Sequence, residues 1–204
     1  MRKRTGEFLG RFCLSAYGKQ MFMKSMKSKL KTALKVFAIL LFIMVFVDKY
    51  IGEGSMVNGR SMQNTLHQGD ILLQEKVSYQ FKEPERYDVV VLKHHAISSE
   101  DQDGLWVKRV IGLPGETLQI LDGEVYVNGK KMQDDIYGNV KIEMAGIASE
   151  PITIPEDEYF VMGDNRMGME SWDSRYEEIS TIKREDIKAK VLVTIYPFER
   201  VALW

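Results

Sequence analysis

The chain of 204 residues is poor in the side chains that bind transition metals, since it has one cysteine, Cys13, and three histidines, His67, His94 and His95. A single cysteine excludes an intramolecular disulfide and a cysteine-based metal site. The three histidines lack the spacing of a zinc motif. We therefore expect neither a metal ion nor a cofactor.

Positive charge is scarce outside the N-terminal part of the chain. Residues 1–35 hold ten Lys or Arg against one acid, Glu7, whereas the remainder has 18 basic and 28 acidic residues. A body with this excess of acid repels phosphate. Nucleic acid is therefore excluded as an expected partner.

Long apolar runs are also few, and the longest uncharged one is VFAILLFIMVFV over 36–47. Twelve residues are too few to span a bilayer, and a core helix or a signal-peptide core has the same pattern. Extension to 32–51 gives about 30 Å of helix, which matches the hydrocarbon thickness. The lysines before it predict a basic cytoplasmic tail over 1–31, with later residues outside the cell. No small-x-small cleavage site follows, which favours a retained anchor.

Beyond Gly52 the pattern changes to short apolar runs that are separated by turn signals, which is typical of strands. Two residue pairs typical of tight hairpin turns, Asp122-Gly123 and Asn128-Gly129, lie between such runs. The predicted strands are Ile71–Glu75, Asp88–Leu92, Trp106–Ile111, Thr117–Leu121, Glu124–Val127, Glu158–Met162 and Lys190–Tyr196.

These elements predict a mainly β protein. We expect an N-terminal transmembrane helix over 32–51 and an extracytoplasmic catalytic domain over 52–204. That domain would be a β-barrel or a coiled sheet, with a smaller β insert at about 117–158.

A serine and a lysine are the candidate catalytic residues. Ser61 follows Gly59, whose backbone freedom suits a nucleophile, although serines in turns are common. Lys108 lies in an apolar strand with Trp106 and Val110 on its face. A lysine that protects a sheet edge from aggregation has this pattern too. Alternatively, burial lowers its pKa and makes it a base near neutral pH, so a Ser–Lys pair fits a chain without a histidine triad.

A third informative stretch is Gly163–Arg175, which holds two acids and two arginines at close range. Bidentate ion pairs among them would hold a loop in place. Solvated surface charges that contribute little are the alternative interpretation.

In order and content, these stretches resemble the bacterial type I signal peptidase family. When the apolar segment before these stretches is included, the resemblance covers about residues 30–204. The matching segments, in chain order, are Ser61–Asp70, Arg86–Val91, Lys108–Gly115 and Gly163–Arg175.

The resemblance implies a membrane-bound serine endopeptidase that removes N-terminal signal peptides and cuts after small residues in an Ala-x-Ala-like pattern. Ser61 would attack the scissile carbonyl, neutral Lys108 would take its proton, and the Ser61 N–H would form the oxyanion hole. Ser171 would orient the lysine. The residues that brace the site would be Asp164, Arg166, Asp173 and Arg175. Those that wall the substrate pockets would be Val57, Met62, Leu66, Val91, Trp106 and Val107.

The implied partners are signal peptides of exported preproteins, membrane lipid and the secretion machinery, and the implied location is the plasma membrane, with one span. The sequence departs from the family pattern at four places. Gly59 stands where some members place a hydroxyl that helps the oxyanion, although many other members also have Gly there. Asn64 stands where proline is usual, Tyr87 stands where glycine is common, and the segment between Arg166 and Asp173 is two residues longer than usual.

Two other functions stay open at this point. A cytosolic Ser–Lys autoprotease of the repressor-cleaving kind needs a DNA-binding domain, against which the apolar segment and the acidic body argue. A non-catalytic, membrane-tethered relative that assists surface or pilus assembly fits the departures, but such a binding module needs neither Ser61 nor Lys108.

Overall fold

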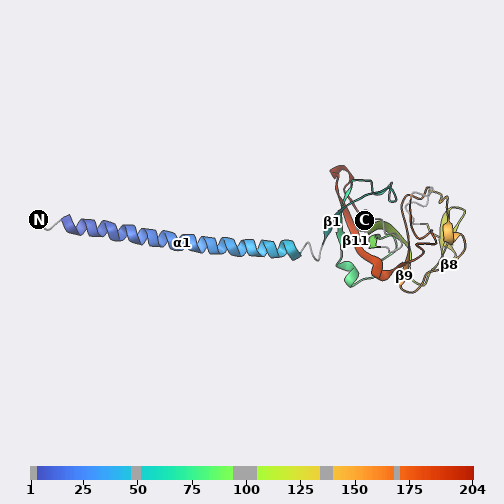
Figure 1. Ribbon diagram of the computed structural model, residues 1–204, viewed down its shortest axis with the longest axis horizontal. Coiled ribbons are helices and arrows are strands. Elements are labelled where there is room, and N and C mark those ends of the chain that lie inside the picture. The colour runs from blue at the N-terminus through green and yellow to red at the C-terminus, as the bar shows by residue number, and fades with distance from the viewer. Residues whose placement is uncertain (1–3, 47–51, 94–104, 134–139, 168–170) are drawn as a thin grey trace. The chain divides into compact units, whose positions relative to one another are not determined.

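The structure is a computed structural model that describes residues 4–46, 52–93, 105–133, 140–167 and 171–204. The chain divides into two compact units, Met1–Asp48 and Lys49–Trp204. The first is helical and the second is a β domain (Figure 1).

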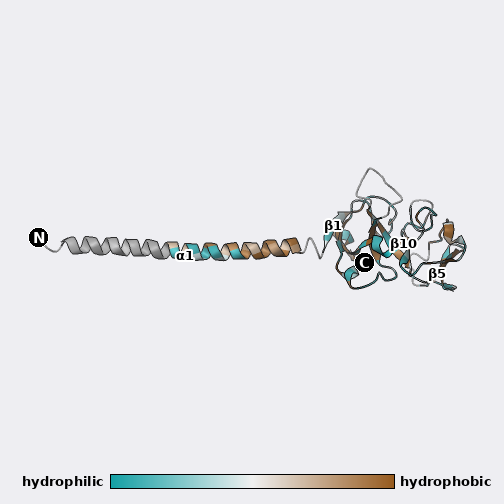
Figure 2. Cartoon of the chain, turned by 60° about the horizontal axis from the view of Figure 1, so that its bottom comes forward, coloured by the Kyte–Doolittle hydropathy of each residue, from teal (hydrophilic) through white to brown (hydrophobic). Residues whose placement is uncertain are grey.

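The first unit consists of one helix, α1 (Arg4–Phe46), which also includes most of the predicted tail over 1–31. Its apolar side chains between Val36 and Phe46 are exposed, and Figure 2 shows that hydrophobic residues gather toward its C-terminal end. No described helix is long and apolar enough to cross a membrane. The predicted span over 32–51 is therefore not confirmed, and its last five residues lie outside the described segments.

The β domain is built on one large antiparallel sheet. Its order is β1-β2-β11-β3-β4-β9-β10, and β12 pairs with β11. Shifts of register in β11 and β4 mark bulges, which bend a sheet. Because β1 and β10 are edges in the described residues, the sheet is open there, and the bulges account for its curl. The strands are β1 (Glu53–Met56), β2 (Ile71–Glu75), β3 (Val89–Lys93), β4 (Leu105–Gly112), β9 (Glu158–Met162), β10 (Ile182–Lys183), β11 (Ile187–Tyr196) and β12 (Ala202–Leu203).

A second sheet occupies 117–153, within the segment where the β insert is expected. Its order is β7-β6-β5-β8, and Figure 1 shows β8 at the far side of the domain from β1. The pairs Asp122-Gly123 and Asn128-Gly129 all have positive φ and close the two hairpins, as their sequence predicts. The strands are β5 (Thr117–Leu121), β6 (Glu124–Val127), β7 (Lys130–Lys131) and β8 (Ile152–Thr153).

Alternation along β3 distributes its side chains between two hydrophobic clusters. Val89 and Val91 pack with Met62 and Leu66 from the loop after β1. The intervening Val90 packs in the cluster on the opposite face, with residues of β9 and β11. The loop that carries Ser61 is thus held against one face of the sheet.

Candidate active site

A cleft of about 840 Å³ lies in the β domain. It is lined by β1, by the loop after β1 and by the N-terminal half of β4. Ser61 and Lys108 both line it, although they come from segments far apart in the sequence. The structure therefore brings the two predicted catalytic residues to one cavity.

The loop that carries Ser61 is closed at its base by the backbone. The Val57 N–H donates to the Asp70 carbonyl at 2.8 Å, and the Gly69 N–H donates to the Val57 carbonyl at 2.9 Å. Gly59 has a φ of 126°, which favours glycine and lets the chain turn just before the serine. Ser61 is half-buried, and no described residue accepts a hydrogen bond from its N–H.

Lys108 is buried, with 4% of its surface exposed, and its Nζ lies 5.5 Å from the centre of the Trp106 ring. Burial lowers its pKa from 10.5 to about 8. The negative charge of Asp173 opposes this shift, whereas the positive charge of Arg175 adds to it. Among the described residues, no hydrogen bond or ion pair joins the Lys108 amine to Ser61 or to a carboxylate.

Ser171, which the resemblance predicts to orient the lysine, donates its hydroxyl to Asp173 Oδ2 at 2.7 Å. The Gly163 N–H donates to the same oxygen at 3.0 Å. Burial alone would raise the pKa of Asp173, but the ion pair with Arg175 and the bond from Gly163 hold it below its ordinary value. Asp173 is thus a buried anion that interacts with Lys108 through its charge.

The four predicted bracing residues are all buried, and three of them take part in two bidentate ion pairs, so the surface-charge interpretation is wrong. Arg175 binds Asp173 at 2.8 and 2.9 Å. Asp164 binds Arg109, which the sequence did not single out, at 2.9 and 2.7 Å. Arg166 donates through Nε to the Gly163 carbonyl at 2.7 Å. The position of Arg109 directly after Lys108 was a usable signal for a supporting residue. Alternation along the strand sends the two side chains to opposite faces, so Arg109 has to find a partner away from the lysine.

Most of the predicted pocket residues line the cleft, namely Val57, Met62, Val91, Trp106 and Val107. Leu66 is not among them, because it is fully buried in the hydrophobic cluster with Met62. Sequence patterns missed the contributions of β1, Gln74 and Trp172 to the lining. No group of His, Cys, Asp or Glu that could hold a metal ion occurs in the segments the structure describes.

A serine hydroxyl and a buried lysine of lowered pKa in one cleft define a candidate Ser–Lys hydrolase site on a mainly β domain. Residues 30–196 match the family model described as "Signal peptidase, peptidase S26". This chain is 33% identical to signal peptidase I T of Bacillus subtilis, over 87% of this chain and 93% of the relative. It is 31% identical to a probable signal peptidase I-2 of Synechocystis sp., over 83% of this chain and 74% of the relative.

A solved signal peptidase I from Enterococcus faecalis V583 is 28% identical, with a TM-score of 0.40. The match covers 53% of this chain and 97% of the chain in the solved structure. The extent of the family match and the curated relatives show that this chain belongs to the signal peptidase family, peptidase S26.

Proposed function

We propose that this protein is a signal peptidase I, a serine endopeptidase that removes N-terminal signal peptides from exported preproteins and cuts after small residues. Its family membership over residues 30–196 supports the reaction class. The observation that carries the proposal is the shared cleft of Ser61 and Lys108, with a lysine pKa of about 8.

In the proposed reaction, Ser61 Oγ attacks the scissile carbonyl while neutral Lys108 accepts the hydroxyl proton. The lysine passes that proton to the leaving amine, and a water that it then activates hydrolyses the acyl-enzyme. A pKa near 8 leaves roughly a tenth of the lysine neutral at pH 7, against about 0.03% for an unperturbed lysine. Burial of Lys108 therefore raises the fraction of competent enzyme by about 300-fold.

The Ser61 N–H is the proposed oxyanion donor. An oxyanion hole needs a fixed N–H that points at the reacting carbonyl oxygen. The closed loop base holds the backbone of Ser61, and no described group uses this N–H. Both observations support the assignment.

The buried ion pairs are proposed to position this machinery. Asp173, which Ser171 and Arg175 hold, keeps a negative charge near Lys108. Asp164 and Arg166 hold the adjacent turn through Arg109 and Gly163. Fixed neighbours of this kind keep catalytic groups within the narrow range of productive geometry.

The signal-peptide end is proposed to bind as an added strand. β1 is an edge strand, and β4 pairs with β9 only from Arg109 onward, so Leu105–Lys108 has no β9 partner in the described residues. Free strand edges supply main-chain hydrogen bonds, and pockets between them select side chains. The apolar lining, which includes Val91, Val107 and Met62, suits small apolar side chains.

The plasma membrane is the proposed location, with the N-terminal segment as a single-span anchor and residues 52–204 outside. The exposed apolar side chains of α1 support an anchor. Contact with the secretion machinery stays a prediction from the resemblance.

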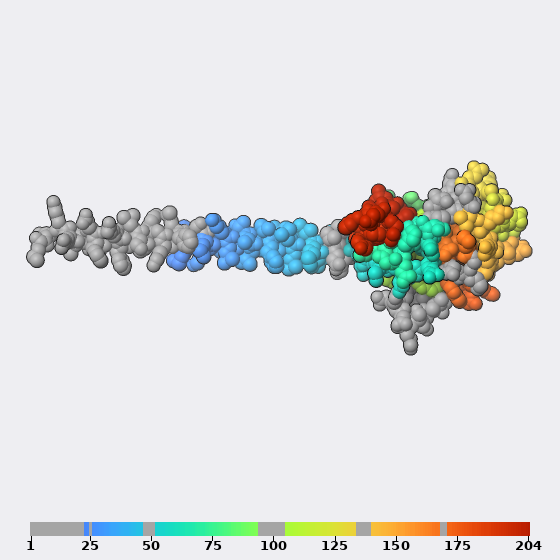
Figure 3. Space-filling view, turned by 90° about the horizontal axis from the view of Figure 1, so that it is seen from above, coloured from blue at the N-terminus to red at the C-terminus, as the bar shows by residue number. Residues whose placement is uncertain are grey.

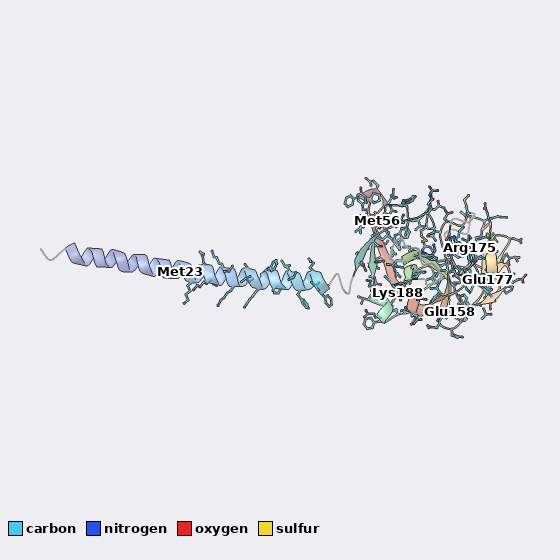
Figure 4. The ribbon with its side chains drawn as sticks, viewed as in Figure 1. Met23, Met56, Glu158, Arg175, Glu177 and Lys188 are labelled. Atoms are coloured by element: carbon cyan, nitrogen blue, oxygen red, sulfur yellow. The ribbon has the colours of Figure 1, made fainter. Side chains whose placement is uncertain are left out.

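The β domain is also proposed to touch lipid. Exposed apolar residues lie on neighbouring strands, since Met56 pairs with Ile71 and Ile71 pairs with Tyr196. Phe198 has 79% of its surface exposed. Its ring packs edge-on against the ring of Tyr196, and the two ring centroids are 5.9 Å apart. Figure 4 labels Met56 at this end of the domain, and in Figure 3 the C-terminal residues lie beside those that follow residue 52.

The test is cleavage of a preprotein with Ala-x-Ala before the cut by membranes that contain the full chain. Ser61→Ala and Lys108→Ala should each abolish cleavage while the circular dichroism spectrum stays native. Ser149→Ala and Lys131→Ala are the matched controls, because both residues are exposed and neither lines the cleft. Normal cleavage by either active-site variant would overturn the mechanism.

Neither alternative function gains support. The relatives described above are named as signal peptidases. A non-catalytic tether predicts that the native chain leaves every preprotein uncut, which the same assay detects.

A further inference from the structure

Gln74 is a buried amide in the wall of the cleft. It lies on β2, pairs with Glu53 of β1 and has 2% of its surface exposed. Its side chain shares a face of β2 with that of Leu72, which is fully buried in the hydrophobic cluster beneath the cleft. Gln74 thus places a polar group on an otherwise apolar face of β2. It does so where that face lines the same cleft as Ser61.

The amide of Gln74 has no hydrogen-bond partner among the described residues. Gln74 is the one cleft-lining residue with a buried, unpartnered side-chain atom, its Oε1, among the residues that the structure describes. Its Nε2 is not among those buried atoms, so it is the part of the amide that a ligand in the cleft reaches. A buried amide without a partner is unfavourable, because it loses its hydrogen bonds to water and gains none in return. A leucine or methionine here would avoid that penalty, so the polar group needs a ligand that completes it.

The surroundings of Gln74 determine what that ligand is. The lining is mixed: Val57, Val91 and Val107 are apolar, whereas Glu53, which lies opposite Gln74 on β1, pairs with Lys76 and makes no hydrogen bond to the amide. A peptide that binds in an extended conformation places alternate side chains against such a wall. An unpartnered amide in the cleft wall pairs with a hydroxyl or amide side chain of the ligand and is left unpaired by an apolar one, and sites of this kind discriminate strongly.

We propose that Gln74 is a specificity-determining residue, whose carboxamide hydrogen-bonds a hydroxyl or amide side chain of the bound signal peptide. At one position before the cut, Ser, Thr or Asn is therefore preferred over an apolar residue of equal size. This inference rests on the proposed cleavage of signal peptides at the cleft.

The experiment compares preproteins that carry Thr or its isostere Val, in turn, at each of the last six positions before the cut. The full-length chain in membranes should show a kcat/KM ratio of Thr to Val of roughly fivefold to tenfold at one position. Gln74→Met, which keeps the side-chain length and removes the hydrogen bonds, should reduce that ratio to one or below. Gln119→Met, on β5 of the second sheet, is the matched control and should leave the ratio unchanged.

A binding measurement separates recognition from folding. In a Ser61→Ala background, the Thr-containing peptide should raise the melting temperature more than its Val counterpart, and Gln74→Met should remove the difference. Cleavage that depends on Ser61 but shows no position at which Gln74→Met changes the ratio more than twofold would overturn this inference and leave the proposed function standing. Absence of any cleavage by the native chain would overturn both.

Discussion

The carbonyl oxygen of Ser61 accepts a hydrogen bond from the backbone N–H of Asn165 at 2.9 Å. This bond joins the loop after β1 to the turn after β9, next to the cleft. Gly163 lies at the same junction, where an added Cβ atom would overlap both the Ser61 carbonyl oxygen and the Ser171 hydroxyl. Glycine is thus required there because two backbones and a side chain meet.

We expect Gly163→Ala to displace Ser61 and to lower kcat/KM by at least tenfold. Overpacking of a buried site costs about 1–3 kcal/mol, which denaturant unfolding would measure as a lower free energy of unfolding. Gly54→Ala, where no atom lies within 4 Å of the added Cβ, is the control for stability. Native stability and activity of Gly163→Ala would show that the junction can open.

The pH dependence of cleavage should follow the neutral form of Lys108. Because burial lowers the pKa of this lysine to about 8, kcat/KM should rise about tenfold per pH unit below that value and level off above it. The measurement is initial rates between pH 6 and 10 on one preprotein. A flat profile from a protein that stays folded would argue against a lysine base.

The same pKa predicts how stability depends on pH. The folded pKa of Lys108, about 8, lies below the ordinary 10.5, so the unfolded chain binds more protons between these values and stability rises with pH across them. Lys108→Met should therefore be more stable than the native chain below pH 8. That advantage should shrink as pH rises toward 10.5. Urea unfolding at pH 7, 9 and 10.5 tests this, and an advantage that grows with pH would contradict it.

Removal of Asp164 should be strongly destabilising. Asp164→Ala leaves Arg109 buried without its carboxylate, and loss of one partner of a buried pair costs about 3–5 kcal/mol. The control is Glu53→Ala, because the pair of Glu53 with Lys76 is exposed and should contribute less than about 1 kcal/mol. Equal losses in thermal unfolding for the two variants would refute this distinction.

Asn64 has a φ of 88°, which a proline ring cannot adopt. Asn64→Pro would therefore restore the usual family residue and yet distort the loop of Ser61. We expect at least a tenfold loss of activity, measured as kcat/KM, whereas Asn64→Gly should retain activity because glycine tolerates positive φ. Full activity of Asn64→Pro would mean that the loop has another conformation in solution.

Local patterns were sufficient for much of the fold. The strands predicted at Ile71–Glu75, Thr117–Leu121, Glu124–Val127 and Glu158–Met162 occur with those bounds. Alternation and turn chemistry act between residues that are close in sequence, so they can be read directly. The edge strand β1 was missed, because a short strand with Gly and Ser has no apolar alternation and forms by pairing with β2.

The partners in the site were less predictable. Sequence proximity suggested ion pairs within Gly163–Arg175, which holds for Asp173 with Arg175 but not for Asp164, whose partner is Arg109 on β4. Ser171 likewise bonds Asp173 and not the lysine among the described residues. Such pairings depend on which strands lie side by side, and spacing within one segment does not encode that.

The sequence by itself determined which residues are available for chemistry, where most strands and tight turns form, and which family the chain resembles. The tertiary structure alone decided that Ser61 and Lys108 share a cleft, that burial lowers the lysine pKa, and that Gln74 stands unpartnered in the wall. The physical reason is that strand and turn preferences act between neighbours along the chain. Desolvation and ion pairing depend on segments that only folding brings together.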